Sequence, residues 1–590
     1  MKPTPISDRT FDVVIAGGGL AGLTLALQLR QRLPAVSVAV VEPIARPLPP
    51  GAHKVGESSV ELGSVYLRQL GLRDYLHSQH VIKLALRFFP GGGELPLHAR
   101  DELGPAREPL MVSYQMDRGK LETDLRAMIE AAGATLYEGA RVTAVERAPG
   151  DTPHTLLVEQ GDTRATLTAR WLIDATGRRA LLRRLDGTTR RTTHLGNAGW
   201  FRVTGKLDIS AMVDPSQREW FERPIAEHRW RSTNHLMGDG YWVWLIPLAD
   251  GRTSVGIVAH EPRHDFDRVR SYEACLGFLD EFEPVLARSL RDWLDNGEEL
   301  LDFKCLKRYS YGVDRWMSAD RWAVVGEAGA FLDPLYSPGT DSIGLSNSYA
   351  VEAIAADFTG GDLAQRVEEM HAQLDALVTH GFHFFDGTGG VYGHARAMTA
   401  KYYWDNFIYW NYHCQHFAQG IHRLTGEELE AFIPLRERFF ALNTWCQILL
   451  RRWAGIEHHT PGGQFISIPR FPSVLIQSNL AILNEMDPEG TFDYMTLRVG
   501  QAERMLVELV LRVLTEIGPE KGAALIEATG LRDWDLRFPP ARVEAEALDE
   551  TARRERLDAI GRDVADHIYP FPRHPDAAAA ARLVLAERTA

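Results

Sequence analysis

The feature that most constrains the fold is a β-branched run followed at once by spaced glycines. Residues 11–16 read FDVVIA, a composition typical of a parallel strand buried on both faces. Gly17, Gly19 and Gly22 come next, and a helical pattern of leucines follows them. In such a turn the first glycine permits a tight bend, the second lets a pyrophosphate approach, and the third lets helix and strand pack closely. This order predicts an α/β fold with a bound dinucleotide.

A second apolar strand strengthens that prediction. Residues 36–41 read VSVAVV, and this strand ends at Glu42, about 20 residues beyond Gly22. Dinucleotide-binding folds place there the carboxylate that binds a ribose. A glycine-rich turn without a ligand is the alternative, and the ordered strand, helix, strand and acid argue against it.

Size and charge narrow the range of partners. At 590 residues the chain exceeds one ordinary core, so we expect two or three domains. The net charge of -14 is spread along the chain, which disfavours nucleic acid as a partner.

We see no apolar stretch of about 18 residues and expect no membrane span. The 4 cysteines lack metal-ligand spacing, so we expect no metal site and reduced thiols in a cytoplasmic protein.

The segment Trp242-Val243-Trp244-Leu245-Ile246-Pro247 is the second strong signal. Successive side chains of a strand alternate between faces, so Trp242 and Trp244 point the same way. Two neighbouring indoles on one face form a rigid aromatic wall. Core packing is the alternative for an isolated W-x-W, because aromatic residues are common in strands.

Three further segments resemble those of FAD-dependent hydroxylases. Asp117 is placed to cap a helix that begins at Arg118. The strand that ends at Asp174 continues into an A-T-G turn, and a late strand ends in G-E-A, where that superfamily has G-D-A. A solvated helix arginine is the alternative for Arg118. The resemblance implies FAD contacts from Arg118, Asp174, Gly177, Gly326 and Glu327.

With W-x-W-x-I-P in this context, the chain resembles the flavin-dependent halogenases of the tryptophan-halogenase-like superfamily. Residues 54–59 read KVGESS and resemble the V-G-E-[AS]-T loop that lies against the flavin in that family. The family's wall separates flavin from substrate, which assigns a catalytic role to Trp242 and Trp244. A helix N-cap is the alternative for the loop serines. The resemblance implies cofactor contacts from Val55, Gly56, Glu57 and Ser58.

Lys83 lies in an alternating segment, Val81–Phe88, which we expect to be one strand. An edge lysine that discourages aggregation is the alternative. The segment follows the V-G-E-S loop at the separation at which halogenases carry their catalytic lysine. By resemblance, Lys83 either hydrogen-bonds hypohalous acid as an ammonium or is transiently halogenated as an amine. The choice depends on its pKa and burial.

Residues 332–340 read LDPLYSPGT and resemble the D-P-L-x-S-[ST]-G halide loop of the family. The resemblance implies halide binding by Ser337, Gly339 and Thr340. Tyr336 stands where tryptophan halogenases carry a glutamate, which favours a phenol, pyrrole or carrier-bound substrate over free tryptophan. Pro338 stands where the family has serine or threonine, and proline has no N–H to donate.

The predicted architecture is an FAD-binding Rossmann-like α/β fold with two additional parts. We expect the FAD-binding domain in residues 1–200 and 316–395, the latter containing the halide loop. A β-rich substrate domain is expected in 201–315, and a mainly α-helical C-terminal domain in 396–590.

The predicted function is that of an FADH2-dependent halogenase. By resemblance, a separate flavin reductase supplies reduced FAD, and O2 with chloride or bromide gives hypohalous acid. The substrate is a small electron-rich aromatic, free or tethered to an acyl carrier, and the protein is a monomer or homodimer. Two alternatives remain: an FAD monooxygenase or other oxidoreductase that does not halogenate, which Pro338 and Glu327 favour, and a non-enzymatic flavin-binding partner.

Overall fold

The N-terminal strands build the expected parallel sheet. The computed structural model describes residues 4–48, 54, 56–457, 462–568 and 573–585. In the first sheet β1 lies between β2 and β10, both parallel to it, and its central residues are fully buried. The strands are β1 Arg9–Ala16, β2 Val38–Glu42, β7 Thr135–Glu138, β8 Ala140–Glu146, β9 His154–Gln160, β10 Thr163–Asp174, β18 Met317–Ser318 and β19 Trp322–Val324.

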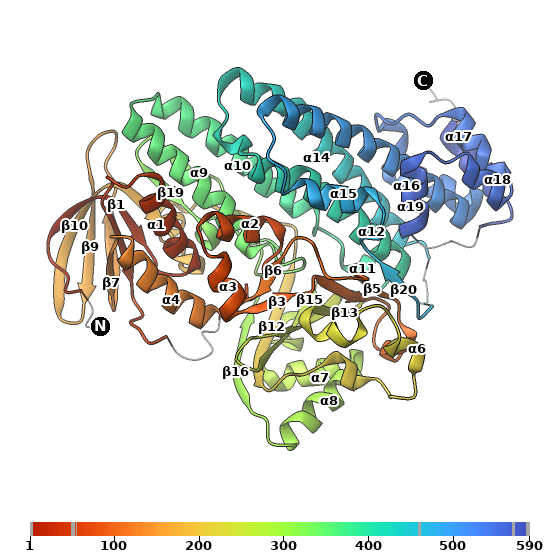
Figure 1. Ribbon diagram of the computed structural model, residues 1–590, viewed down its shortest axis with the longest axis horizontal. Helices are drawn as coiled ribbons and strands as arrows, with labels where there is room; N and C mark the ends of the chain where they lie inside the picture. Colours follow the sequence, from red (N-terminus) through yellow and green to blue (C-terminus); the bar gives the residue numbers. More distant parts are fainter. Residues whose placement is uncertain (1–3, 49–53, 55, 458–461, 569–572, 586–590) are drawn as a thin grey trace.

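Helices cover this sheet. Helix α1 contacts both α4 and α9, and α9 returns from residue 339 to pack beside the first helix of the chain (Figure 1). The FAD-type fold is therefore completed by a segment more than 300 residues downstream of its start. The helices of this part are α1 Leu20–Arg32, α2 Glu61–Gln69, α3 Arg73–Gln79, α4 Arg118–Ala131, α5 Leu181–Asp186 and α9 Gly339–Thr359.

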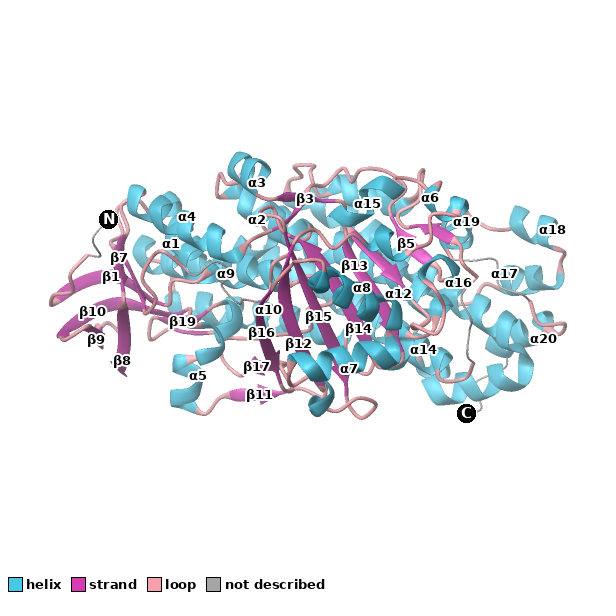
Figure 2. Cartoon of the chain, turned by 90° about the horizontal axis from the view of Figure 1, so that it is seen from below, coloured by secondary structure: helices cyan, strands magenta, loops and turns pink. Residues whose placement is uncertain are grey.

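The second sheet carries the paired tryptophans. Its strand order is β16-β12-β15-β14-β13-β4-β5-β20, and Figure 2 shows α7 and α8 against it. Strands β4, β5 and β20 lie outside residues 201–315, so this sheet recruits distant segments. Its strands are β4 Leu86–Phe89, β5 Glu102–Gly104, β12 Gly196–Thr204, β13 Thr233–Gly238, β14 Tyr241–Pro247, β15 Arg252–His260, β16 Leu300–Leu306 and β20 Phe465–Ser467; the packed helices are α6 Arg218–Phe221, α7 Tyr272–Phe282 and α8 Pro284–Asp295.

The prediction of one strand over Val81–Phe88 is wrong. The chain forms β3 (Val81–Lys83), bends at Ala85 with a φ of 111°, and resumes as β4 in the other sheet. Strand β3 pairs with β6 (Ser113–Gln115) instead. Hydrophobic alternation continues across the bend, so the pattern alone does not reveal the change of sheet. Two short strands, β11 Thr189–Arg191 and β17 Tyr311–Val313, form a separate pair.

The C-terminal part is mainly helical, as predicted, and it shares one hydrophobic core with the FAD-type part. A π-helical turn, Tyr409–His413, interrupts the helix between α12 and α13. In the described ranges no helix has the length and hydrophobicity needed to cross a bilayer. The helices are α10 Leu363–His383, α11 Gly389–Tyr392, α12 Ala395–Ile408, α13 Cys414–Ala418, α14 Gly426–Ala454, α15 Val474–Ala481, α16 Pro488–Thr529, α17 Pro540–Glu544, α18 Glu550–Glu555, α19 Ala559–His567 and α20 Ala577–Arg582.

Candidate active site

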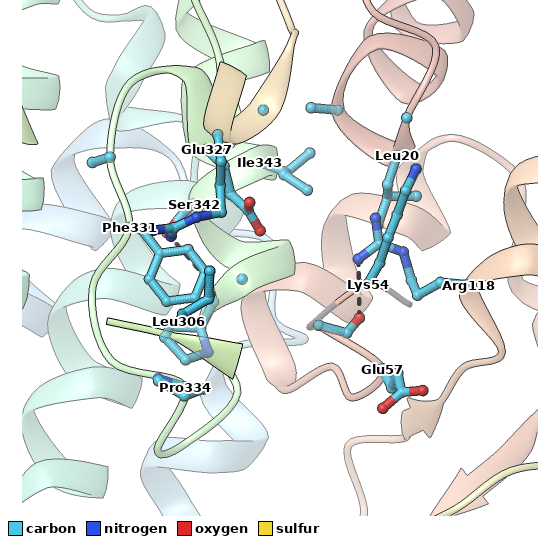
Figure 3. A pocket seen from close by; sticks show the side chains of 18 of the residues that line it. Leu20, Lys54, Glu57, Arg118, Leu306, Glu327, Phe331, Pro334, Ser342 and Ile343 are labelled. Atoms are coloured by element: carbon cyan, nitrogen blue, oxygen red, sulfur yellow. Dashed lines mark hydrogen bonds between the residues drawn. The ribbon is translucent and has the colours of Figure 1, made fainter. Parts of the chain in front are cut away.

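A cavity of about 500 Å³ lies where the first sheet meets the tryptophan strand. In Figure 3, Lys54, Glu57 and Arg118 lie on one side of it, and Glu327, Phe331 and Pro334 on the other. We call it the flavin cavity because most of the residues expected to contact FAD line it. The predicted site residues that line it are Gly17, Gly19, Glu42, Gly56, Glu57, Ser58, Arg118, Gly177, Trp242, Trp244, Glu327, Ser337 and Gly339. Val55 lies outside the described residues.

The glycine turn has the geometry that a pyrophosphate requires. Gly17 adopts a φ of +110°, and a Cβ added there would lie 2.3 Å from the carbonyl oxygen of Ala175. A Cβ at Gly22 would lie 2.0 Å from the carbonyl oxygen of Gly17. Gly19 precedes α1 without a side-chain cap, so the first amides of the helix remain available to an anion. Gly17 and Gly22 therefore have the turn and packing roles predicted for them, and the approach of a pyrophosphate at Gly19 stays a prediction.

Glu42 lies at the rim of the flavin cavity. Its Oε2 accepts a hydrogen bond from the amide of Gly18 at 2.7 Å, and its Oε1 accepts one from the amide of Ile44 at 2.9 Å. Each carboxylate oxygen has a second acceptor position. The side chain can thus hold the glycine turn and still accept from a ribose hydroxyl.

Basic side chains meet at the start of α4. Asp117 caps this helix by accepting from the amide of Lys120 at 2.9 Å, as expected. Arg118 donates to the carbonyl oxygen of Gly56 at 3.2 Å and to Glu122 Oε1 at 2.7 Å. Lys54 also pairs with the buried Glu122. Sequence reasoning missed Lys54 and Glu122, although the four-residue spacing from Arg118 to Glu122 was a usable signal. The positive charges of Lys54 and Arg118, together with the available amides at the start of α1, fit an anionic dinucleotide such as FAD.

Two residues predicted to contact FAD, Asp174 and Gly326, do not line the flavin cavity. Asp174 is buried, and its oxygens accept from the amides of Thr176 at 2.9 Å and Leu182 at 2.7 Å. It shapes the turn that brings Gly177 to the cavity. Gly326 donates its N–H to Ser346 Oγ at 2.9 Å and does not line the cavity. Glu327 does line it, and burial raises the pKa of this carboxyl group.

The two tryptophans form one wall of the flavin cavity. Their ring centroids lie 5.6 Å apart, and both side chains are buried. Trp244 lies over Gly256 of the next strand, where an added Cβ would be 2.1 Å from the indole ring. Sequence reasoning missed Gly256, since only the strand register pairs it with Trp244. The alternation argument for a shared face is thus confirmed.

Lys83 is fully buried, which rules out the edge-lysine alternative. Its Nζ donates to Ser58 Oγ at 2.9 Å and to the carbonyl oxygen of Ser59 at 3.0 Å. Burial lowers the pKa of Lys83 to about 7, and the charges of Glu61 and Asp341 oppose this shift. Lys83 itself does not line the flavin cavity, but its partner Ser58 does.

The predicted halide loop turns sharply before α9. Tyr336 and Ser337 both adopt the left-handed backbone region, with φ of 67° and 59°. Pro338 is the N-cap of α9, so Gly339 and Thr340 supply the first two amides of that helix. The Thr340 side chain is buried towards α2 and does not line the flavin cavity, so only its backbone is suited to the predicted role. Proline has no N–H, but Pro338 precedes the helix, so the amides of Gly339 and Thr340 are both still present.

A buried cluster that sequence reasoning missed fixes the start of this loop. Asp333 Oδ2 lies 2.6 Å from His194 Nε2 and also accepts from the Tyr309 hydroxyl. Its Oδ1 accepts from the amide of Leu335 at 2.8 Å. Because Asp333 lines the flavin cavity, this network connects the protein core to the loop.

Comparisons with known proteins agree with this geometry. The family model described as "FAD binding domain" matches residues 10–255. The flavin-dependent halogenase chlA of Dictyostelium discoideum is 28% identical over 433 residues, which cover 68% of this chain and 70% of that protein. The 1H-pyrrole-2-carbonyl-[peptidyl-carrier protein] chlorinase of Pseudomonas fluorescens is 27% identical over 387 residues, covering 62% and 78%. The chain thus contains an FAD binding domain and is similar to flavin-dependent halogenases.

The resemblance of this protein to solved structures extends into its helical part. The crystal structure of halogenase PltM in complex with phloroglucinol and FAD matches with a TM-score of 0.60 and 15% identity. The match covers 84% of this chain and 96% of that one, which shows a shared fold. The expected FAD-binding fold class is thereby confirmed.

The described residues also form a smaller cavity of about 110 Å³, which we call the helix chamber. Leu332, Pro338 and Ser342 line both cavities, so the halide loop separates them. Glu61 and Asp341, whose charges act on Lys83, line the helix chamber. Lys83 therefore lies between the two spaces. The chamber is completed by aromatic and polar side chains of α10, α12 and the π-helical turn, among them Phe384, Phe385, Tyr402, Asp405, Asn406, Tyr409 and His413.

Proposed function

We propose that this protein is an FADH2-dependent halogenase that makes hypohalous acid in the flavin cavity and transfers electrophilic halogen to an electron-rich aromatic in the helix chamber. The observation that carries the proposal is the position of Lys83. It is a fully buried lysine that contacts the flavin cavity through Ser58 and acts electrostatically on two carboxylates of the helix chamber.

The flavin cavity would hold FAD by the glycine turn, Glu42 and the Lys54 and Arg118 cations. Bound reduced FAD would supply, with O2, the oxidising chemistry that converts chloride or bromide to hypohalous acid. The amides of Gly339 and Thr340 point from a helix N-terminus and hold the halide. Trp242 and Trp244 exclude water and keep the aromatic substrate away from the oxidation site.

Lys83 acts in the next step as an ammonium ion. It donates a hydrogen bond to the oxygen of hypohalous acid and so polarises the oxygen–halogen bond. Because its pKa is near 7, the ammonium form is well populated at neutral pH and can also give up its proton to the departing hydroxide. The hydrogen bonds to Ser58 and Ser59 hold the nitrogen between the two spaces.

We further propose that the substrate is a phenol or pyrrole, free or tethered to a carrier protein, and that a separate flavin reductase is the partner. Support for a tethered substrate comes from two relatives whose names specify pyrrole-2-carbonyl groups on a peptidyl-carrier protein. Tyr336 supports the exclusion of free tryptophan, because it replaces the glutamate of the tryptophan branch.

A trapping assay tests the proposal. Purified protein receives FAD, a generic flavin reductase, NADH, oxygen, catalase and bromide, together with a small halogen acceptor analysed by mass spectrometry. We expect brominated acceptor that disappears without enzyme or without bromide. Flavin binding and oxidation with an oxygenated product that does not depend on halide would instead identify an FAD monooxygenase.

A further inference from the structure

The wall of the helix chamber contains a carboxylate for which the proposed function gives no role so far. Asp405 lies on α12, is 3% exposed and lines this chamber. Its Oδ1 accepts from Gln447 Nε2 at 2.7 Å, and its Oδ2 forms an ion pair with Lys401 Nζ at 2.8 Å. The Tyr336 hydroxyl also interacts with this carboxylate, and the two oxygens together offer about four acceptor positions, of which one is left. Asp405 is thus a fixed, charge-balanced acceptor with capacity left for a ligand.

The pair is insulated from water. Lys401 is fully buried, and its Nζ also donates to the carbonyl oxygen of Phe384 at 2.6 Å and to Gln447 Oε1 at 2.8 Å. Burial raises the pKa of Asp405, whereas the neighbouring Lys401 charge opposes that shift. The carboxylate is therefore a stronger base than one in water, while Lys401 favours its charged form.

Other carboxylates at the chamber are already committed. Asp341 accepts from the amide of Gly63 at 2.7 Å and from the Tyr409 hydroxyl at 2.7 Å. Asp341 and Glu61 also act on the charge of Lys83. These two acids belong to the lysine end of the chamber, whereas Asp405 enters from α12.

The shape of the chamber indicates what it accepts. Its volume is about 110 Å³, and an engineered apolar cavity of about 150 Å³ is known to hold benzene. The rings of Tyr336 and Tyr402 lie 6.3 Å apart and within 20° of parallel. Phe88 contacts both of these tyrosine rings edge-on. A space smaller than that cavity and walled by aromatic rings admits at most one flat ring and excludes fused ring systems.

We propose that Asp405 is the catalytic base of the helix chamber and removes the ring proton from a single-ring phenol or pyrrole during halogenation. This inference rests on the proposed halogenase function. A ring carbon forms its bond to halogen as the oxygen–halogen bond of hypohalous acid breaks, and the leaving hydroxide takes a proton from Lys83 to give water. The C–H proton then passes to the Asp405 carboxylate, and its electron pair restores the aromatic ring. Lys83 and Asp405 regain their charges when product leaves.

The test compares wild type with Asp405→Asn, using resorcinol, ring-deuterated resorcinol and bromide in the reductase-coupled assay. We expect bromination of resorcinol to fall by about 100-fold. A hydrogen isotope effect on ring bromination should appear in the variant and be absent in wild type, because proton loss becomes rate-limiting. A purely structural role for Asp405 would lower the rate without creating this isotope effect.

Matched variants keep the result decisive if Asp405→Asn folds poorly. Asp405→Glu keeps the carboxylate and should lack the isotope effect. Asn406→Ser alters the adjacent wall without removing a base and should lack the isotope effect as well. Wild-type bromination of a small trap tests the proposed function separately. If the trap reacts but folded Asp405→Asn brominates resorcinol at the wild-type rate, the base assignment is wrong. Equal rates with 2-naphthol and resorcinol would refute the single-ring limit.

Discussion

The flavin cavity and the helix chamber share the wall formed by Pro338 and Ser342, yet they are built in different ways. The flavin cavity lies at the carboxyl ends of parallel strands, where short glycine-bearing turns present backbone amides and cations. The helix chamber lies between the sides of helices and is walled by aromatic rings. The first is therefore encoded by contiguous motifs, and the second only by the packing of distant segments.

The charges of the two spaces also differ. The flavin cavity is lined by five cations, Lys54, Arg118, Arg178, Arg179 and Lys304, together with the acids Glu42, Glu57, Glu327 and Asp333. The helix chamber is lined by the acids Glu61, Asp341 and Asp405 and, among the residues that the structure describes, by no lysine or arginine. An anionic cofactor and a halide suit the first, and a neutral aromatic ring that must lose a proton suits the second. Lys83 lies at the boundary, so a comparison of variants on either side can separate oxidation of the halide from its transfer.

The largest effect is expected from Lys83→Met. Acceptor bromination should fall by about 1,000-fold, because the boundary loses its proton donor. Flavin binding should persist, since Lys83 lines neither cavity. Mass spectrometry of the acceptor and flavin titration measure the two effects, with the exposed Lys206→Met as control. If Lys83→Met still brominated the acceptor, Lys83 would not be the residue that transfers halogen from the flavin cavity to the helix chamber.

A stability effect should come from Glu57, which lines the flavin cavity and is 5% exposed. Burial raises the pKa of its carboxyl group from 4.5 to about 7. The folded protein binds this proton more tightly, so the associated stability is fully present below about pH 4.5 and is lost as the pH rises through about 7.

Glu57→Gln imitates the protonated carboxyl group and should therefore be more stable than wild type at pH 8. The shift sets an upper limit of about 3 kcal/mol on the gain in unfolding free energy. Urea unfolding of the flavin-free protein at pH 5 and pH 8 measures it, with the exposed Glu430→Gln as control. An equal gain at both pH values would contradict the assigned cause.

A smaller effect should follow from Gly256→Ala, which places a methyl group against the Trp244 ring. Tilting this wall should reduce brominated product per NADH by about 10-fold, because reactant positions shift by a fraction of an ångström. Gly277→Ala is the control, since an added Cβ meets nothing there. Unchanged coupling would show that the wall does not separate the two spaces.

The smallest effect is expected from Pro338→Thr, which restores an N–H at the N-cap of α9. One hydrogen bond contributes about 1 kcal/mol, so the KM for bromide should fall about fivefold. Pro539→Thr, at the N-cap of α17, is the matched control. An unchanged KM would show that the amides of Gly339 and Thr340 bind the halide without help from the cap position.

The sequence predicted the parts whose signals are local. The glycine turn, the Asp117 cap and the shared face of Trp242 and Trp244 each follow from backbone rules that act over a few residues. The fate of Val81–Phe88 was not predictable in this way, because the bend at Ala85 depends on which distant strand pairs with each half. The inward direction of the Asp174 carboxylate was not predictable for a related reason: the motif locates the turn but not the direction of its side chain.

The helix chamber left no comparable trace in the sequence. Residues 402–412 are dense in aromatic residues, and the spacing of Tyr403, Phe407 and Trp410 predicts a buried helix face, with a wall of the substrate pocket as the alternative. Those three residues are buried. Tyr402 and Asp405, which line the chamber, lie on another side of the same helix and come before a π-helical turn. Which side of a helix meets a cavity is decided by the packing of α9, α10 and α12, and one sequence does not record that choice.

The central position of β1 in its sheet has a consequence for biosynthesis. This strand is made well before its parallel neighbour β10, which begins only at Thr163. At typical elongation rates β1 waits about 10–30 s for that partner. During this interval a strongly apolar strand has an unpaired edge, which is the arrangement most prone to pair with other chains. Yields from heterologous expression should therefore rise with chaperones that shelter newly made β1 and fall when slower translation lengthens the wait.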